Sequence, residues 1–114
     1  MFTVIFYETA DGKKPIEEFL DSLDLKLQAK TVQLMELLEE KGNELREPYS
    51  KHLDDGIFEL RASQAGNISR VLYFFYFDKQ IVITNGFIKK QQKTPLREIK
   101  LAKKRRSDFL NRQK

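Results

Sequence analysis

Two arginines stand where the strand pattern could let them bind a phosphate. Glu59 and Arg61 are two residues apart in a segment that alternates like a β-strand, so their side chains share one face. If the chain turns near Ala65-Gly66, Arg61 lies opposite Arg70 in the next strand. Like charges directly opposite each other destabilise a sheet, and an anion between them would remove that cost. The alternatives are a turn shifted by one residue, or neutralisation of the pair by Glu59 and Asp78.

Three lysines add to this charge at the end of the last predicted strand. Lys89, Lys90 and Lys93 come just before the terminal helix, and helix N-termini favour phosphate through free N–H groups and the helix dipole. Together with Arg61 and Arg70, they predict a groove lined for phosphate. Taken singly, each lysine is more simply explained as a solvated side chain.

The single histidine, His52, is the candidate general base. It lies in a predicted loop next to Lys51, which with Lys93 is a candidate contact for a nucleic-acid backbone. The alternative for His52 is a structural or merely exposed side chain. Asp54 and Asp55 precede a glycine and indicate a turn, and the chain has no cysteine. We therefore expect neither a metal site nor a cofactor.

Positive charge gathers in the second half of the chain. Residues 1–60 hold 7 Lys and Arg against 14 Asp and Glu, a balance of −7, whereas residues 61–114 hold 14 against 3, a balance of +11. Such asymmetry suggests a polyanion partner. The densest run is suited to contacts with a nucleic-acid backbone, or equally to docking an acidic protein; it consists of Lys103, Lys104, Arg105 and Arg106.

The pattern of apolar residues predicts the elements that carry these side chains. We expect strands at Met1–Tyr7, Ile57–Ala62, Ile68–Asp78 and Gln80–Ile88, helices at Pro15–Leu23, Asp24–Lys41 and Thr94–Leu110, and a loop at Asn43–Asp55. A helical hairpin should pack on one face of a small, mostly antiparallel sheet, with a C-terminal helix. This is an α+β fold.

Single residues predict where these elements begin, end and face. Asp24 should cap the second helix and Gly42 should end it, whereas Thr94 should cap the terminal helix. Phe58 and Leu60 should face the helical hairpin, because they alternate with the polar residues of their strand.

Length and composition limit the class of protein. A chain of 114 residues, 40% hydrophobic and 11% aromatic, can form a single domain with a real core, and we expect that domain to span residues 1–114. No apolar run reaches the roughly 18 residues of a membrane helix. The apolar start of the chain stops at Glu8, which argues against a signal peptide. We therefore expect a cytoplasmic protein.

Three segments together resemble the RelE/HigB superfamily of type II toxins, and specifically its phage-derived HigB-like branch. They are KHLDDGIFELR (Lys51 to Arg61), RVLYFFYFDKQIVITNGFIKK (Arg70 to Lys90) and TPLREIKLAKKR (Thr94 to Arg105). The resemblance implies a RelE-like microbial ribonuclease fold. It also implies a ribosome-dependent endoribonuclease that cuts mRNA and is neutralised by a HigA-like helix-turn-helix antitoxin. Operator DNA would be bound only through that antitoxin, in a heterotetramer of two toxins and two antitoxins.

The resemblance also assigns roles to single residues. Arg70 matches the arginine that contacts the scissile phosphate in relatives, and Arg61 ends a strand that carries basic residues there. Lys89 and Lys90 match a basic pair that aids phosphate or leaving-group chemistry. The chain departs from relatives at Ile57 and Glu59, where lysines are expected. It also lacks, after residue 93, the usual tyrosine or histidine.

Metal-free cleavage of RNA by its own 2′-OH suits these residues. Arginines stabilise the phosphorane charge well because their paired donors match phosphate geometry. Lys89 or Lys90 would serve the leaving oxygen, and His52, Glu59 or a lysine of lowered pKa would transfer the proton. The alternatives are a non-catalytic RNA- or ribosome-binding module, a degenerate toxin, and a domain that only docks an acidic partner protein.

Overall fold

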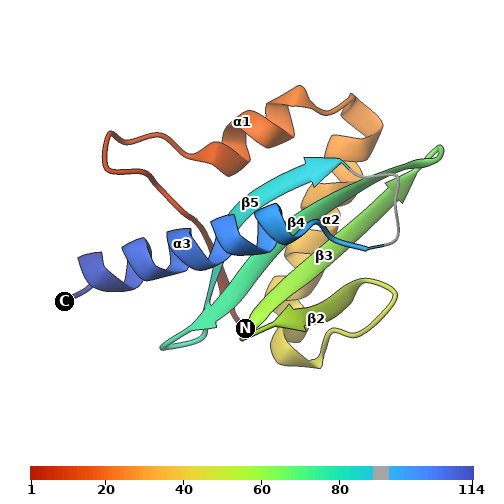
Figure 1. Cartoon of the computed structure of the whole chain (residues 1–114). Helices are drawn as coiled ribbons and strands as arrows, with labels where there is room; N and C mark the ends of the chain where they lie inside the picture. The colour runs from red at the N-terminus through yellow and green to blue at the C-terminus, as the bar shows by residue number, and fades with distance from the viewer. Residues whose placement is uncertain (89–92) are drawn as a thin grey trace.

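The computed structural model describes residues 1–88 and 93–114, and within them one sheet separates two layers of helix (Figure 1). The strands are β1 (Thr3–Phe6), β2 (Ser50–Asp54), β3 (Ile57–Gln64), β4 (Asn67–Tyr76) and β5 (Gln80–Ile88), in the sheet order β1-β5-β4-β3-β2. Strand β1 runs parallel to β5, and the other neighbours are antiparallel. The predicted α+β class with a mostly antiparallel sheet is therefore confirmed.

A helical hairpin covers one face of the sheet, as predicted. It consists of α1 (Pro15–Ser22) and α2 (Leu25–Lys41). The Asp24 carboxylate accepts a hydrogen bond from the Leu27 N–H at 2.9 Å, and Gly42 ends α2 with a φ of 56°. Phe58 and Leu60 of β3 pack into the core beneath this hairpin, so the predicted direction of both side chains is confirmed.

The terminal helix α3 (Leu96–Arg112) covers the opposite face of the sheet (Figure 1). It buries Ala102 in a second core with apolar residues of β3, β4 and β5, but Leu96 remains 68% exposed. Polar contacts therefore hold α3 in place as well. The Lys103 ammonium lies 2.5 Å from the Asp54 carboxylate, and Tyr7 donates a hydrogen bond to Asp108 at 2.6 Å.

Tight turns with left-handed residues join the antiparallel strands. Ala65 and Gly66 have φ values of 51° and 83°, and the turn they form confirms the predicted connection between β3 and β4. Asp78 and Lys79 have φ values of 63° and 56° in the tight turn that joins β4 to β5. Paired positive φ angles match the right-handed twist of the flanking strands, so these turns fix the register of the sheet.

Two sequence predictions are wrong. The segment Asn43–Asp55 is not a loop, because it contains the short helix η1 (Gly42–Glu44) and strand β2, which is the edge strand next to β3. Thr94 does not cap α3, since Pro95 occupies the N-cap position and makes no side-chain cap bond there. In the described part of the chain, no helix has the length and apolar character needed to cross a membrane.

Candidate functional site

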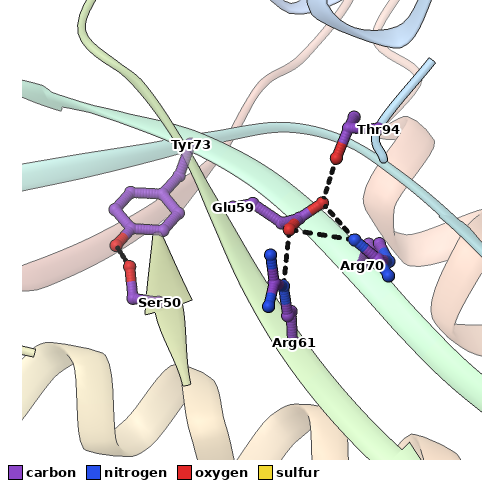
Figure 2. A network of polar contacts seen from close by, with 6 residues as sticks. All are labelled: Ser50, Glu59, Arg61, Arg70, Tyr73 and Thr94. Atoms are coloured by element: carbon purple, nitrogen blue, oxygen red, sulfur yellow. Dashed lines mark hydrogen bonds and ion pairs between the residues drawn. The ribbon is translucent and has the colours of Figure 1, made fainter. Parts of the chain in front are cut away.

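The register of the sheet places Arg61 directly opposite Arg70, as predicted. Both side chains lie on the face that α3 covers. Arg70 is two residues from Leu72 in β4, so the two side chains share one face, and Leu72 packs in the second core under α3. The turn at Ala65-Gly66 sets this register. Two cations therefore stand side by side near the start of α3 (Figure 2).

Glu59 holds the arginine pair together from β3. Its side chain has no exposed area, and it accepts hydrogen bonds from Arg61 Nε at 2.7 Å and from Arg70 Nη1 at 3.1 Å to both carboxylate oxygens. The Thr94 hydroxyl donates a further bond to Glu59 Oε1 (Figure 2). The alternative that Glu59 and Asp78 neutralise the pair is therefore confirmed only for Glu59, which offsets one of the two charges, whereas Asp78 lies in the turn at the far end of β4.

The surroundings of Glu59 keep it ionised. Burial by itself raises the pKa of a carboxyl group, but hydrogen bonds from Thr94, Arg61 and Arg70, together with the charge of Arg70, outweigh burial and lower the pKa of Glu59 below its ordinary value. The carboxylate is therefore an acceptor shared by three donors. With two arginines around one carboxylate, the cluster retains one net positive charge.

Arg61 is the more accessible member of the pair. Its side chain is 26% exposed, compared with 4% for Arg70. Arg61 contacts Glu59 through Nε, and within the described residues its Nη groups have no protein acceptor. An incoming phosphate could accept from these donors without displacing Glu59.

The structure places His52 away from the arginine pair. His52 lies in β2 opposite Phe58, so its side chain is on the α2 face of the sheet, whereas Arg61 and Arg70 are on the α3 face. Its Nε2 accepts a hydrogen bond from the Gly56 N–H at 3.1 Å, and its ring meets the ring of Phe58 edge-on. The geometry therefore does not support the predicted role of His52 as the general base beside these arginines.

Tyr73 is also on the α2 face and does not replace His52. Its hydroxyl is 2.5 Å from the Ser50 hydroxyl, and the side chain is buried (Figure 2). Burial raises the pKa of Tyr73 to about 12, against a smaller lowering by Ser50. This phenol therefore stays protonated at neutral pH.

Three of the four cations in the basic run of α3 contact the rest of the chain. Lys103 pairs with Asp54 at 2.5 Å, Arg106 pairs with Asp55 at 2.8 Å, and Arg105 donates to the Thr84 carbonyl at 2.8 Å. Lys104 is exposed. The predicted RNA-binding role of this run stays a prediction, and for Lys103, Arg105 and Arg106 an anchoring role is now evident.

The remaining predicted basic residues divide by location. Lys51 is exposed and stands opposite Glu59 in the register of β2 and β3, so its side chain lies on the same face of the sheet as the arginines. Lys93 is exposed next to Thr94. Lys89 and Lys90 lie outside the described residues.

The sequence analysis did not predict Thr94 as a partner of Glu59, because a Thr-Pro sequence is typical of a helix cap. Only the tertiary structure shows the contact between the two side chains.

Within residues 1–88 and 93–114, there is no group of three or more potential metal ligands.

No curated protein sequence matches the chain significantly. The family model of phage-derived Gp49-like proteins (DUF891) matches residues 18–107, a span that includes Glu59, Arg61, Arg70 and Thr94. This is a toxin-like family of the RelE/HigB type, so the resemblance is confirmed at that level, whereas the HigB-like branch stays a prediction. The chain therefore belongs to the family of phage-derived Gp49-like proteins.

Proposed function

We propose that this chain is the toxin of a type II toxin–antitoxin system and acts as a metal-independent mRNA endoribonuclease on the ribosome. The observation that carries the proposal is the pair Arg61 and Arg70, aligned on neighbouring strands and held by a buried, ionised Glu59. Membership of a toxin-like family supports the same function.

The arginine pair suits one part of RNA cleavage in particular. When a 2′-OH attacks the adjacent phosphate, negative charge develops on the phosphorane oxygens, and fixed guanidinium donors stabilise that charge. Glu59 fixes the donors before the RNA arrives, so it acts as a positioning residue. Lys89 or Lys90 is proposed to serve the leaving oxygen.

The engagement of Glu59 with its donors supports the proposed dependence on the ribosome. A general base needs an oxygen or nitrogen that can take the 2′-OH proton, but Glu59 already accepts from three donors and His52 is on the other face. In-line positioning of the RNA by the ribosome would then supply a large part of the rate enhancement. The proposal includes a cytoplasmic location and neutralisation by a helix-turn-helix antitoxin, in a heterotetramer.

Inducible expression in a bacterial host tests the proposal. Wild-type chain should arrest growth and create new 5′ ends in messages. Arg61→Gln and Arg70→Lys should each reduce cleavage by about 100-fold or more, because each loses part of the guanidinium fork that stabilises the phosphorane. Arg112→Gln, an arginine change at the far end of α3, should cleave like wild type.

Circular dichroism and thermal unfolding of each purified variant would separate lost chemistry from lost folding. Wild-type cleavage by a folded Arg61→Gln variant would contradict the proposed role of the pair. Normal growth and intact messages with soluble wild-type protein would contradict the ribonuclease activity itself.

One observation favours a second candidate, a non-catalytic RNA-binding module or degenerate toxin. The carboxylate nearest the arginines is fully engaged, so the same cluster could bind RNA without transferring a proton. This candidate predicts salt-dependent RNA affinity and no new message ends.

A further inference from the structure

A groove runs along the outer side of the arginine pair, between α2 and the free edge of β3. The first residue of β2, Ser50, stands opposite Leu60. The remainder of β3, from Arg61 to Gln64, therefore has no neighbouring strand on that side in the described structure. The groove has a volume of about 790 Å³, which is within the range of small-molecule sites. Leu34 and Leu37 of α2 supply apolar lining.

An aromatic side chain lines this groove close to the site. Tyr49 is 47% exposed, so its ring is accessible to a ligand in the groove. Its carbonyl accepts the Arg61 N–H at 2.9 Å, so the backbone holds Tyr49 beside Arg61. The nucleotide next to a phosphate held by Arg61 would therefore meet an aromatic ring.

The charge of the groove favours an anionic ligand. Its lining includes Lys30, Arg61 and Arg70, and none of its described lining residues is acidic. These three cations outnumber the one carboxylate beside them, that of Glu59, which pairs with both arginines. This is notable because residues 1–60, which include α2, carry a balance of −7.

A second groove provides an internal comparison. It lies between β1, α2 and the end of α3, has a volume of about 650 Å³, and is lined by Glu8, Glu36 and Glu39 as well as by Lys14 and Arg112. Two grooves of similar size on one molecule thus differ in charge, and the one without carboxylates is the one that adjoins Arg61 and Arg70.

We propose that the groove along β3 binds the base and sugar of a single-stranded RNA nucleotide next to the phosphate held by Arg61 and Arg70. Tyr49 stacks on the base, and Lys30 pairs with a neighbouring phosphate. Stacking on an aromatic ring accepts any base, so the groove contributes affinity more than sequence preference. The inference rests on the proposed function, since it takes the arginine pair as the site of the scissile phosphate.

Binding of an RNA that cannot be cleaved tests the groove separately from the chemistry. The probe is a fluorescein-labelled single strand of about ten nucleotides with 2′-fluoro sugars, measured by fluorescence anisotropy. Tyr49→Ala should weaken binding by roughly ten-fold, whereas Tyr49→Phe should bind like wild type. Phe77→Ala, which removes a 79% exposed aromatic ring in the β4–β5 turn, is the matched control and should leave affinity unchanged.

The salt dependence of binding tests the cation. Lys30→Gln should reduce the slope of log affinity against log salt by about 0.7, as expected for one phosphate contact on a single strand. Lys13→Gln removes the same charge from an exposed residue before α1 and should not change the slope.

The outcomes separate this inference from the proposed function. Loss of affinity in Tyr49→Ala without any message cleavage by wild type would support the groove and contradict the ribonuclease. Message cleavage with equal RNA affinity in wild type and Tyr49→Ala would contradict the groove alone and leave it to another ligand, such as a protein segment. Absence of RNA binding by wild type at low salt would also overturn the inference.

Discussion

Glu59 is the residue on which the arrangement of the site depends. Burying an ion pair costs desolvation energy, and the attraction repays that cost only when geometry and additional hydrogen bonds are good. Glu59 meets this condition with three donors from β3, β4 and the segment before α3. Because the two guanidinium groups are already ordered, binding a phosphate loses less side-chain entropy than it would with mobile arginines.

Replacing Glu59 by glutamine should destabilise the fold. Glu59→Gln preserves the shape of the side chain but leaves the charge of Arg70, which is 3% exposed, without its carboxylate. We expect the free energy of unfolding to fall by about 3–5 kcal/mol, as for other broken buried pairs. Urea denaturation followed by circular dichroism measures the change. Glu40→Gln, on the exposed side of α2, is the control, and an equal effect of both variants would contradict the prediction.

The same carboxylate should make stability depend on pH. The pKa of Glu59 is lowered in the folded state from its ordinary value of 4.5. Its stabilisation is therefore fully present above that value and is lost as pH falls through the lower, native pKa.

Thermal unfolding between pH 6 and about 3 checks this sign. The melting temperature of wild type should fall more steeply on acidification than that of Glu59→Gln. The difference between the two curves isolates Glu59 from Asp54 and Asp108, whose pKa values are also lowered, chiefly by hydrogen bonds from Lys103 and Tyr7. Parallel curves would show that Glu59 does not titrate with unfolding.

The arginine pair could be predicted from the sequence, whereas strand β2 and the position of His52 could not. The pairing of Arg61 with Arg70 follows from a local turn and the alternation of two neighbouring strands, and it was predictable. Strand β2 has an exposed Lys51 and His52 and no clear apolar alternation, because it is a short edge strand. Without β2, nothing in the sequence shows that His52 falls on the α2 face.

Contacts between distant segments were also beyond sequence analysis. The Thr94 hydroxyl reaches Glu59, and Asp54 and Asp55 reach Lys103 and Arg106. In each case, residue types indicate a local role, such as a cap, a turn or a solvated charge. Only the packing of α3 across the sheet turns them into tertiary partners.

Helix α3 should loosen when its acidic partners are removed. The double variant Asp54→Asn, Asp55→Asn keeps residues that suit the turn but removes the charges that pair with Lys103 and Arg106. Exposed ion pairs are screened by water and contribute little each, so amide exchange in α3 should speed up by only a few-fold. Hydrogen–deuterium exchange with mass spectrometry measures this.

Exchange in α1 serves as the internal reference, and Asp21→Asn, on the exposed side of α1, is the matched variant. Unchanged protection of α3 in the double variant would mean that the apolar contacts of Ala102 and Phe109 suffice to hold it.

At the scale of the whole molecule, the two halves of the chain partly neutralise each other. The basic half supplies the second half of β3, all of β4 and β5, and α3, whereas the acidic half supplies β1, α1, α2, β2 and the first half of β3. Lys103 and Arg106 meet Asp54 and Asp55, so part of the positive balance is used inside the molecule. The charge asymmetry of the sequence therefore overstates the charge offered to a polyanion, and the groove along β3 is a more specific indication.

The parallel pairing of β1 with β5 has a consequence for the folding pathway. Strands β2 to β5 form a meander in which neighbours in sequence are neighbours in space, whereas β1 must find Ile81 and Val82 across most of the chain. Closing so long a segment is entropically costly, and local pairings form sooner. Val4→Ala should therefore accelerate unfolding and leave the refolding rate almost unchanged in stopped-flow chevron measurements. If Val4→Ala instead slowed refolding in proportion to the lost stability, β1 would belong to the folding nucleus; with refolding unchanged, β1 joins the sheet after the rate-limiting step.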